Sequence, residues 1–205
     1  METNIPIQNS KAILGDLYDA GKNLTGEGCV VEMGCWLGGS IAPVAKALKD
    51  SNKEVDIHCY DRFYVAPDRC GKSEVEKAKA RGVSLKLKQD TLPLVKSYLN
   101  PINSNIIYHK CDVYNAKWVG EPIELYMDDV CKAKPLFLHS LKVFSPYWVP
   151  NKTILFLMDF NYWAAKSQKI FMKKYNDHFI KIKEFGNYSS CAIFLYTKKL
   201  NSIEF

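Results

Sequence analysis

The sequence predicts an α/β fold in which helices cover both faces of a seven-stranded, mostly parallel sheet with an antiparallel last strand. Three observations lead to this fold class. Short apolar runs, typical of buried strands, alternate along the chain with segments of helical periodicity. The last two strand-like segments have no helix between them, which indicates antiparallel pairing. The chain has 205 residues and is 47% hydrophobic, enough for a single domain over residues 1–205.

The first quarter of the chain predicts a helix, a strand and a second helix. Residues 1–24 are an N-terminal helical segment, in which Ser10 is a suitable N-cap for a helix over 10–23. Residues 28–33 form an apolar run of strand length. A helix over 40–49 follows a glycine turn, and it tolerates Pro43 because the first helical turn needs no amide donor.

The next segments predict a strand, a loop and a helix. Residues 55–60 alternate between apolar and polar side chains, as in a half-buried strand. Residues 64–82 are polar and charged and contain Pro67 and Gly71, so we expect a mobile loop that serves as a lid. Asp90 is a suitable cap for a helix that runs through residue 98.

The rest of the chain continues the alternation of strands and helices. Strands are predicted at 106–109, 123–127 and 153–158, and helices at 136–144 and 164–176. A hairpin-like pair of strands, 179–185 and 191–197, is joined through Gly186 and Asn187 and closes the sheet.

The most informative segment is residues 30–40, Val-Val-Glu-Met-Gly-Cys-Trp-Leu-Gly-Gly-Ser. A buried strand that turns through glycines into a helix brings backbone N–H groups against a small polar ligand. A dinucleotide fingerprint has glycine where this chain has Trp36, and an indole there would collide with a pyrophosphate. Glu32 can instead meet a cationic amino group. The pattern favours a ligand with an amino-acid end and a nucleoside end; the alternative is a purely structural turn.

Each of the first five predicted strands ends in or near an acidic residue. These acids are Glu32, Asp61, Asp112, Asp128 and Asp159. Ligands of parallel α/β sheets bind beyond the carboxyl ends of the strands, so we expect a polar rim around one crevice. Asp61 follows the glycine turn by about 20 residues, the spacing at which an acid meets ribose hydroxyls. A turn or capping role is the alternative for each acid taken singly.

Together, these segments resemble the class I S-adenosylmethionine-dependent methyltransferases. More narrowly, they are similar to small bacterial sugar and natural-product O-methyltransferases of the macrocin O-methyltransferase type. The matching residues are 32–40, 60–63, 111–113, Trp118 and 123–129. The resemblance spans about residues 25–160, and it implies a Rossmann-like fold, S-adenosylmethionine as cofactor and methyl transfer to a small polar acceptor.

The resemblance also implies roles for individual residues. Glu32 would hold the amino group of the cofactor, the glycine turn its methionine part, Asp61 its ribose, and Asp112 with Val113 its adenine. The full set of cofactor-binding residues expected on this basis is Glu32, Gly34, Cys35, Trp36, Gly38, Gly39, Ser40, Asp61, Arg62, Asp112, Val113 and Asp128.

Methyl transfer to an alcohol needs a general base at the crevice. The candidates are Asp128, Asp129 and Asp159, with Asp128 the first choice because it ends the fourth strand. As an alternative, Asp128 and Asp159 would hold Mg²⁺ and lower the pKa of the acceptor. Metal-dependent sugar enzymes of this kind usually have two consecutive acids after the fifth strand, whereas this chain has Asp159 and then Phe160 and Asn161. That departure puts the metal in doubt.

Charge and composition indicate which classes of binding partner and which cellular location to expect. A net charge of +6 favours an anionic small-molecule acceptor, such as a nucleotide sugar or sugar phosphate. No basic stripe with interleaved aromatic residues is present, so we do not expect nucleic acid. No apolar run is long enough to cross a membrane and no signal peptide is evident, so we expect a cytoplasmic protein that is free to form homo-oligomers. The seven cysteines (29, 35, 59, 70, 111, 131 and 191) include no C-x-x-C pair, which predicts reduced thiols and neither a disulfide framework nor a zinc site.

The leading hypothesis is therefore O-methylation of a sugar, a sugar nucleotide or another small polar metabolite, in bacterial glycan biosynthesis or secondary metabolism. An N-methyltransferase acting on a small amine would use the same cofactor site without a strong base. A nucleic-acid methyltransferase is disfavoured because the segment after Asp159 lacks the two prolines of the motif that stacks a flipped base. A non-catalytic cofactor-binding partner of a larger complex is the remaining alternative.

Overall fold

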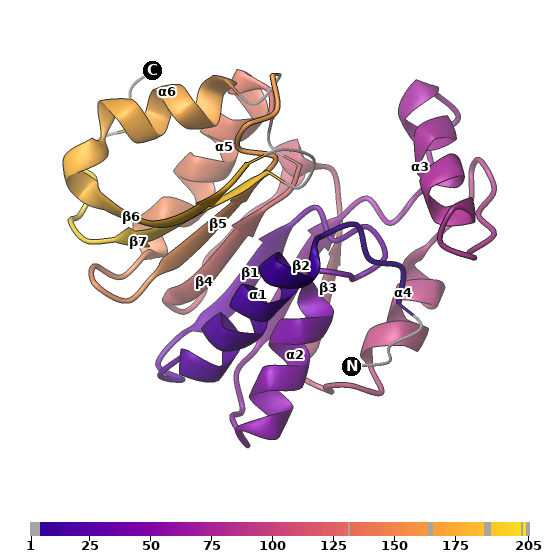
Figure 1. Cartoon of the computed structure of the whole chain (residues 1–205), viewed down its shortest axis with the longest axis horizontal. Coiled ribbons are helices and arrows are strands. Elements are labelled where there is room, and N and C mark those ends of the chain that lie inside the picture. Colours follow the sequence, from indigo (N-terminus) through magenta and orange to yellow (C-terminus); the bar gives the residue numbers. More distant parts are fainter. Residues whose placement is uncertain (1–4, 131, 164–165, 187–189, 202, 204–205) are drawn as a thin grey trace.

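The computed structural model describes the whole chain except residues 1–4, 131, 164–165, 187–189, 202 and 204–205. At its centre lies one seven-stranded sheet with the strand order β3-β2-β1-β4-β5-β7-β6 (Figure 1). The strands are β1 (Cys29–Met33), β2 (Ile57–Asp61), β3 (Ile106–Lys110), β4 (Ile123–Asp128), β5 (Ile154–Met158), β6 (Phe179–Phe185) and β7 (Cys191–Tyr196). The predicted antiparallel finish is confirmed: β7 is antiparallel to β5 and β6, while the other neighbouring pairs are parallel.

The described residues form the helices α1 (Lys11–Asn23), α2 (Ile41–Asp50), α3 (Arg69–Lys79), α4 (Leu92–Leu99), α5 (Lys134–Phe144) and α6 (Lys166–Lys174), with 3₁₀ turns η1 (Val113–Asn115), η2 (Ser145–Tyr147) and η3 (Asn176–His178). Five of the six helices lie where the sequence predicts a helix, whereas α3 lies in the segment predicted as a loop. Cys131, the predicted helix start at Ala164 and the predicted turn residue Asn187 lie outside the described residues. Over the described residues, no helix combines the length and the apolar character that crossing a membrane requires.

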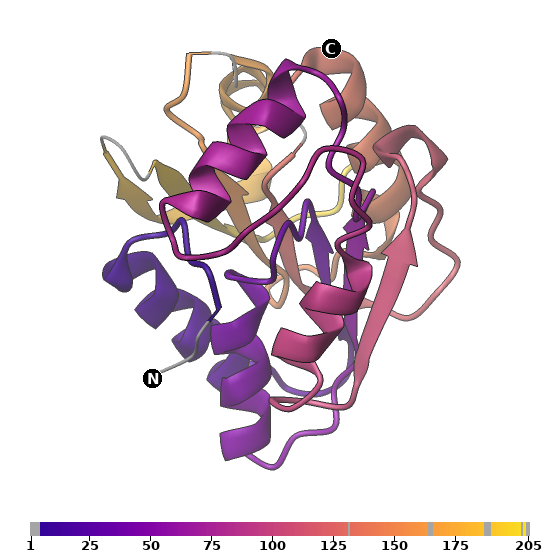
Figure 2. The same ribbon diagram turned by 90° about the vertical axis from the view of Figure 1, so that its right-hand side faces the viewer.

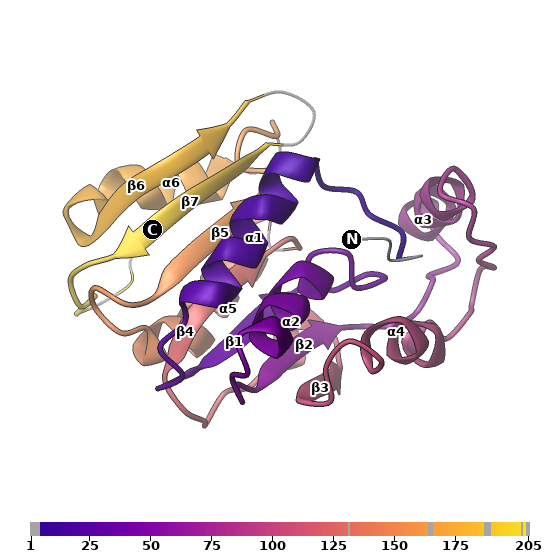
Figure 3. The same cartoon turned by 60° about the horizontal axis from the view of Figure 1, so that its bottom comes forward.

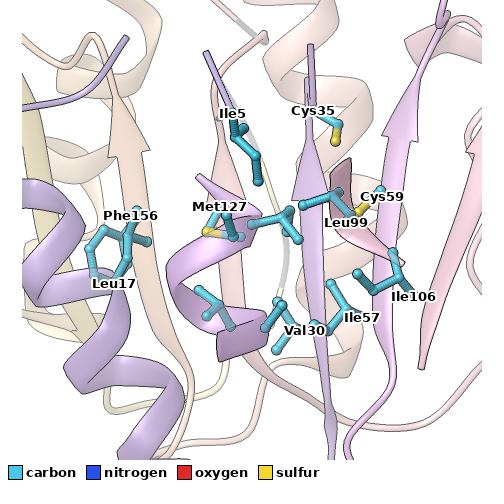
Figure 4. Close-up of a cluster of buried hydrophobic side chains, with 14 of the residues drawn as sticks. Ile5, Leu17, Val30, Cys35, Ile57, Cys59, Leu99, Ile106, Met127 and Phe156 are labelled. Carbon is cyan, nitrogen blue, oxygen red and sulfur yellow. The ribbon is translucent and has the colours of Figure 1, made fainter. Parts of the chain in front are cut away.

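Helices cover both faces of the sheet, as predicted (Figure 3). Successive residues of a strand point to opposite faces. Val30 of β1 therefore joins Leu17 of α1 and Phe156 of β5 in one apolar cluster (Figure 4). Its neighbour Val31 joins a second cluster with Phe137 of α5. Burying each large side chain of this kind contributes about 1.5–3 kcal/mol, so the two clusters stabilise the three layers.

Residues 64–82 differ from the prediction of a mobile loop, because most of them form α3 (Arg69–Lys79). The Asp68 side chain caps this helix by accepting a hydrogen bond from the Gly71 amide at 2.9 Å. Glycine is required there because a Cβ atom would lie 1.8 Å from the Ala66 carbonyl oxygen. The helix escaped prediction because it buries only two small residues and so lacks an apolar stripe. Figure 1 shows α3 standing away from the sheet, and Figure 2 views the molecule from the side on which α3 lies. The role of α3 as a lid stays a prediction.

Gly38, in the turn from β1 to α2, provides a test of this packing. It has φ +87°, and an added Cβ would lie 2.8 Å from Leu99 Cδ1 of α4. We expect Gly38→Ala to lower the free energy of unfolding by about 1–3 kcal/mol, because it adds both backbone strain and overpacking. Urea unfolding followed by circular dichroism measures this change.

Gly15→Ala is the matched control, because Gly15 lies within α1 and an added Cβ meets nothing within 4 Å. That substitution should raise the free energy of unfolding by about 0.5–1 kcal/mol through helix propensity. Equal effects of the two substitutions would contradict the described turn.

Candidate functional site

The carboxyl ends of the parallel strands open onto one cavity of about 700 Å³, a volume typical of small-molecule sites. Residues at or just after the ends of β1 to β5 line it. They are Gly34, Asp61, Cys111, Asp112, Asp129 and Asp159, the last four following β3, β4 and β5. The structure thus brings most of the predicted rim together around one crevice.

The Asp61 carboxylate fixes the turn after β1 to the turn after β2. Its Oδ2 accepts a hydrogen bond from the Trp36 amide at 2.9 Å, and its Oδ1 accepts one from the Phe63 amide at 2.7 Å. Trp36 and Phe63 have φ of 45° and 46°, which costs non-glycine residues about 1–2 kcal/mol each. Burial raises the pKa of Asp61. A carboxylate has about four lone-pair directions, so Asp61 retains acceptor capacity for hydroxyl groups in the cavity.

Glu32 lies at the same edge of the sheet but is buried and does not itself line the cavity. Its carboxyl interacts with the side chains of Cys35 and Ser40, while its Oε2 atom has no hydrogen-bond partner among the described residues. Burial, with a contribution from the nearby Asp129, raises the pKa of Glu32 well above its ordinary value. A buried acceptor of this kind is costly unless a donor reaches it, which fits a ligand that carries an ammonium group.

Gly34 lets the chain pass close to the loop after β4. It has φ +92°, and an added Cβ would lie 2.9 Å from Val130 Cβ. Both residues line the cavity, together with the half-buried Trp36. The turn therefore forms part of the cavity wall, and the cofactor-binding roles expected for Gly34 and Trp36 stay predictions.

The remaining residues of the motif shape the turn without lining the cavity. Cys35 is buried, Gly38 packs against α4, and the space where a Gly39 Cβ would lie is bounded by the Pro6 carbonyl oxygen at 3.0 Å. The Ser40 hydroxyl accepts a hydrogen bond of 2.8 Å from the Asn9 side chain. These contacts position the N-terminal segment, whose Gln8 and Asn9 do line the cavity.

The predicted adenine-binding residues lie on the wall formed after β3. Asp112 caps η1, and its Oδ1 accepts a hydrogen bond of 3.0 Å from the Tyr114 amide. Asp112, Val113 and Tyr114 line the cavity, and Arg62 lines it from the end of β2. The structure therefore keeps together the pair Asp112 and Val113 that the sequence singled out.

An acid–lysine cluster, made of Asp129, Lys132 and Asp159, lines the cavity on the side of β4 and β5. The Lys132 ammonium lies 2.7 Å from Asp159 Oδ2, 3.4 Å from Asp129 Oδ1 and 2.6 Å from the Asp129 carbonyl oxygen. Burial opposes the charge on Lys132, but the two acids raise its pKa above the ordinary value. Burial raises the pKa of Asp129 to about 6, Lys132 opposes this shift and Asp159 adds to it.

Asp128, the first choice for a base from the sequence, is fully buried and does not line the cavity. Its Oδ1 accepts a hydrogen bond of 3.2 Å from the Val130 amide, so it supports the loop after β4. The residues do not fit the Mg²⁺ site expected from Asp128 and Asp159, because these two acids are not both at the cavity and Asp159 is paired with Lys132.

The sequence did not identify Lys132 as a site residue. It also did not identify the cavity-lining residues that lie outside the segments directly after the strands. These residues come from the N-terminal segment and from α3, and they include Gln8, Asn9, Glu74, Lys77 and Arg81. Burial raises the pKa of Glu74. A lysine three residues after the acid at a strand end was the available signal for Lys132. Of the aromatic residues that follow β5, Phe160 is buried while Tyr162 and Trp163 are exposed, and none of the three lines the cavity.

No family model and no curated protein matches the chain. Solved structures match it at low sequence identity. The O-methyltransferase NovP is 13% identical with a TM-score of 0.66, over 90% of this chain and 79% of NovP. CalS11, a TDP-rhamnose 3′-O-methyltransferase in calicheamicin biosynthesis, is 15% identical with a TM-score of 0.60, over 90% and 77%. A putative rRNA methylase from Clostridium thermocellum is 16% identical with a TM-score of 0.54, over 94% and 98%. The chain has the fold of the solved methyltransferases.

Asp61 provides a test of the site's geometry. We expect Asp61→Ala to lower the free energy of unfolding by about 1–3 kcal/mol, because it leaves two amide donors in the turns without their charged acceptor. Asp112→Ala is the control, because it removes a single cap from an exposed 3₁₀ turn and should cost less than about 1 kcal/mol. Denaturant titrations of both variants measure the difference, and an Asp61→Ala protein as stable as wild type would contradict the role of this carboxylate.

Proposed function

We propose that the protein is an S-adenosylmethionine-dependent methyltransferase that methylates an oxygen atom of a small polar acceptor. One observation carries the proposal. A single cavity at the carboxyl edge of the sheet combines a nucleoside-type wall, made by Asp61, Asp112 and Val113, with an acid–lysine cluster suited to activating a hydroxyl group. The likeness to NovP and CalS11, whose names describe O-methylation, supports the choice of oxygen.

The residues around the cavity fit this cofactor. Glu32 does not line the cavity, so its unpartnered Oε2 would receive the ammonium group only after a small shift of the cavity wall. Asp61 would bind the ribose hydroxyls, and Asp112 with Val113 the adenine. Gly34 provides the close backbone approach, since any side chain there would meet Val130. When bound, S-adenosylmethionine supplies an electrophilic methyl group. The chain's part is to orient the acceptor oxygen toward it, which can supply several kcal/mol of barrier reduction.

Asp129 is the proposed general base. Its carboxylate lines the cavity, and its pKa of about 6 leaves it mostly deprotonated at neutral pH but still able to accept a proton. It would take the proton of the acceptor hydroxyl as that oxygen attacks. Asp128 cannot do this from its buried position, so the role passes to the next residue along the chain.

Lys132 is the proposed positioning residue of the cluster. Its ammonium is held between Asp129 and Asp159, so it offsets their mutual repulsion and places a fixed positive charge beside the reacting oxygen. In a metal-dependent enzyme, Mg²⁺ would provide this positive charge beside the acceptor oxygen. We therefore propose that the reaction does not need a divalent metal.

The acceptor is proposed to be anionic, such as a nucleotide sugar or sugar phosphate. Arg62 and Lys77 line the cavity, and among the described residues neither forms an ion pair. Both charges also interact electrostatically with Glu74, a third residue of this wall, and the two cations outnumber this one acid where a phosphate group would enter beside α3. TDP-rhamnose, the substrate after which CalS11 is named, belongs to the same chemical class.

Isothermal titration with S-adenosylhomocysteine and with NADH tests the cofactor. We expect binding of the former only, and a 10–100-fold weaker affinity in Glu32→Gln, because a charge-assisted hydrogen bond to the ammonium is lost. Glu76→Gln, an exposed change on α3, is the control and should bind as wild type does. Binding of NADH without S-adenosylhomocysteine would overturn the assignment.

A screen of nucleotide sugars, neutral sugars and amines first identifies an acceptor. The pH dependence of single-turnover methyl transfer to that acceptor then tests Asp129 as the base. The rate should fall as pH drops through about 6, because Asp129 becomes protonated. Asp129→Asn should remove this limb and slow transfer about 10²–10⁴-fold. Lys132→Met should move the limb to higher pH, because the repulsion between Asp129 and Asp159 is no longer offset.

Three results would contradict these roles. A low-pH limb that survives in Asp129→Asn would exclude Asp129 as the base. Loss of activity on chelation by EDTA would show that the reaction needs a divalent metal. Turnover of amines alone would indicate N-methylation, and cofactor binding with no turnover on any acceptor would indicate a non-catalytic partner.

A further inference from the structure

A second cluster of chemically active side chains lies outside the cavity. Cys29 begins β1, His58 lies in β2, and Glu121 precedes β4. One ligand atom from each of the three, the Cys29 sulfur, a His58 ring nitrogen and a Glu121 carboxylate oxygen, lies within 4.8 Å of the other two. None of the three lines the cavity, so the cluster is separate from the proposed active site.

His58 is oriented for coordination by its neighbour on β3. Its Nδ1 is hydrogen bonded to His109 Nε2 at 2.9 Å, which leaves its Nε2 for another partner. That Nε2 is buried, has no hydrogen-bond partner among the described residues, and lies 3.8 Å from Glu121 Oε1. An imidazole whose second nitrogen is hydrogen bonded to a neighbouring group is the usual arrangement of a metal-binding histidine.

The loop that carries Glu121 is held in place by Trp118. The indole Nε1 donates a hydrogen bond of 3.1 Å to the Glu121 carbonyl oxygen, and the ring meets His58 edge-on at 4.6 Å. The donors therefore sit on a framework of two strands and a braced loop. This rigidity reduces the ordering that ion binding would require.

We propose that Cys29, His58 and Glu121 form a binding site for a divalent transition-metal ion of the zinc class. This departs from the expectation of no zinc site, which rested on the lack of a C-x-x-C pair, because the structure brings together donors that are distant in sequence. Thiolate, imidazole and carboxylate are the ligands that Zn²⁺ takes in proteins, and three of them leave a fourth tetrahedral position for water. A 3.8 Å separation between His58 Nε2 and Glu121 Oε1 is close to the spacing of two ligands around one such ion, with a small contraction on binding.

Binding would release the thiol proton of Cys29 to solvent, since the thiolate is the ligand. Cys29 is buried, whereas the Glu121 side chain is 46% exposed, so the ion would enter past Glu121. It would then tie β1 and β2 to the loop before β4. The ion would therefore brace this part of the sheet, and its occupancy does not depend on the proposed methyl transfer.

Titration of the reduced, metal-free full chain with Co²⁺ tests the proposal, because cobalt reports its ligands spectroscopically. We expect the visible bands of tetrahedral Co²⁺ and a thiolate-to-cobalt charge-transfer band, both displaced by Zn²⁺. Cys29→Ser should abolish the charge-transfer band, whereas Cys70→Ser, a change at an exposed cysteine of α3, should keep it. Zn²⁺ should also raise the melting temperature of the wild-type chain.

Glu121→Gln decides the outcome if Cys29→Ser does not fold, because Glu121 is partly exposed. It should weaken Co²⁺ binding at least tenfold, whereas the exposed control Glu54→Gln should leave binding unchanged. The absence of a charge-transfer band overturns the proposal, as does unchanged affinity in Glu121→Gln. A band that survives Cys29→Ser and disappears in Cys35→Ser also overturns it, and would assign the ion to the buried trio Glu32, Cys35 and Cys59.

Discussion

The cavity depends on the two hydrogen bonds that the Asp61 carboxylate accepts from the amides of Trp36 and Phe63. Both donors belong to residues in the left-handed region, where a non-glycine backbone does not rest without support. The charged acceptor offsets that strain and ties the turn after β1 to the turn after β2. This part of the cavity wall therefore depends on one half-buried carboxylate, whose remaining acceptor capacity faces the cavity.

On the opposite side of the cavity, the acid–lysine cluster of Asp129, Lys132 and Asp159 combines two negative charges with one positive charge. Two carboxylates at the ends of neighbouring strands would repel each other at the cavity, where both side chains are only partly exposed. The Lys132 ammonium, 2.7 Å from Asp159, offsets this repulsion but leaves the pKa of Asp129 raised to about 6. The balance of burial, repulsion and one cation therefore sets the protonation of the proposed base near neutral pH.

One face of β2 connects the cavity with the cysteine–histidine–glutamate cluster. Tyr60 lines the cavity, and its ring stacks on His109 with centroids 4.1 Å apart. His109 in turn meets His58, which occupies the same face of β2 two residues before Tyr60. An ion at Cys29 and His58 would thus brace the layer of side chains on which one wall of the cavity rests.

The sequence by itself determined which segments form strands and the glycine turn after β1. It also determined that acidic residues follow the carboxyl ends of the strands. Apolar runs, residue alternation and turn chemistry are local, so each can be recognised without knowing what packs against it. Tertiary structure alone decided that Asp129 and not Asp128 faces the cavity, because consecutive residues at a strand end point to opposite sides. It also decided that the polar segment after β2 forms α3 against the cavity. Cys29, His58 and Glu121 are far apart in sequence, so only the pairing of β1 with β2 and β4 could bring them together.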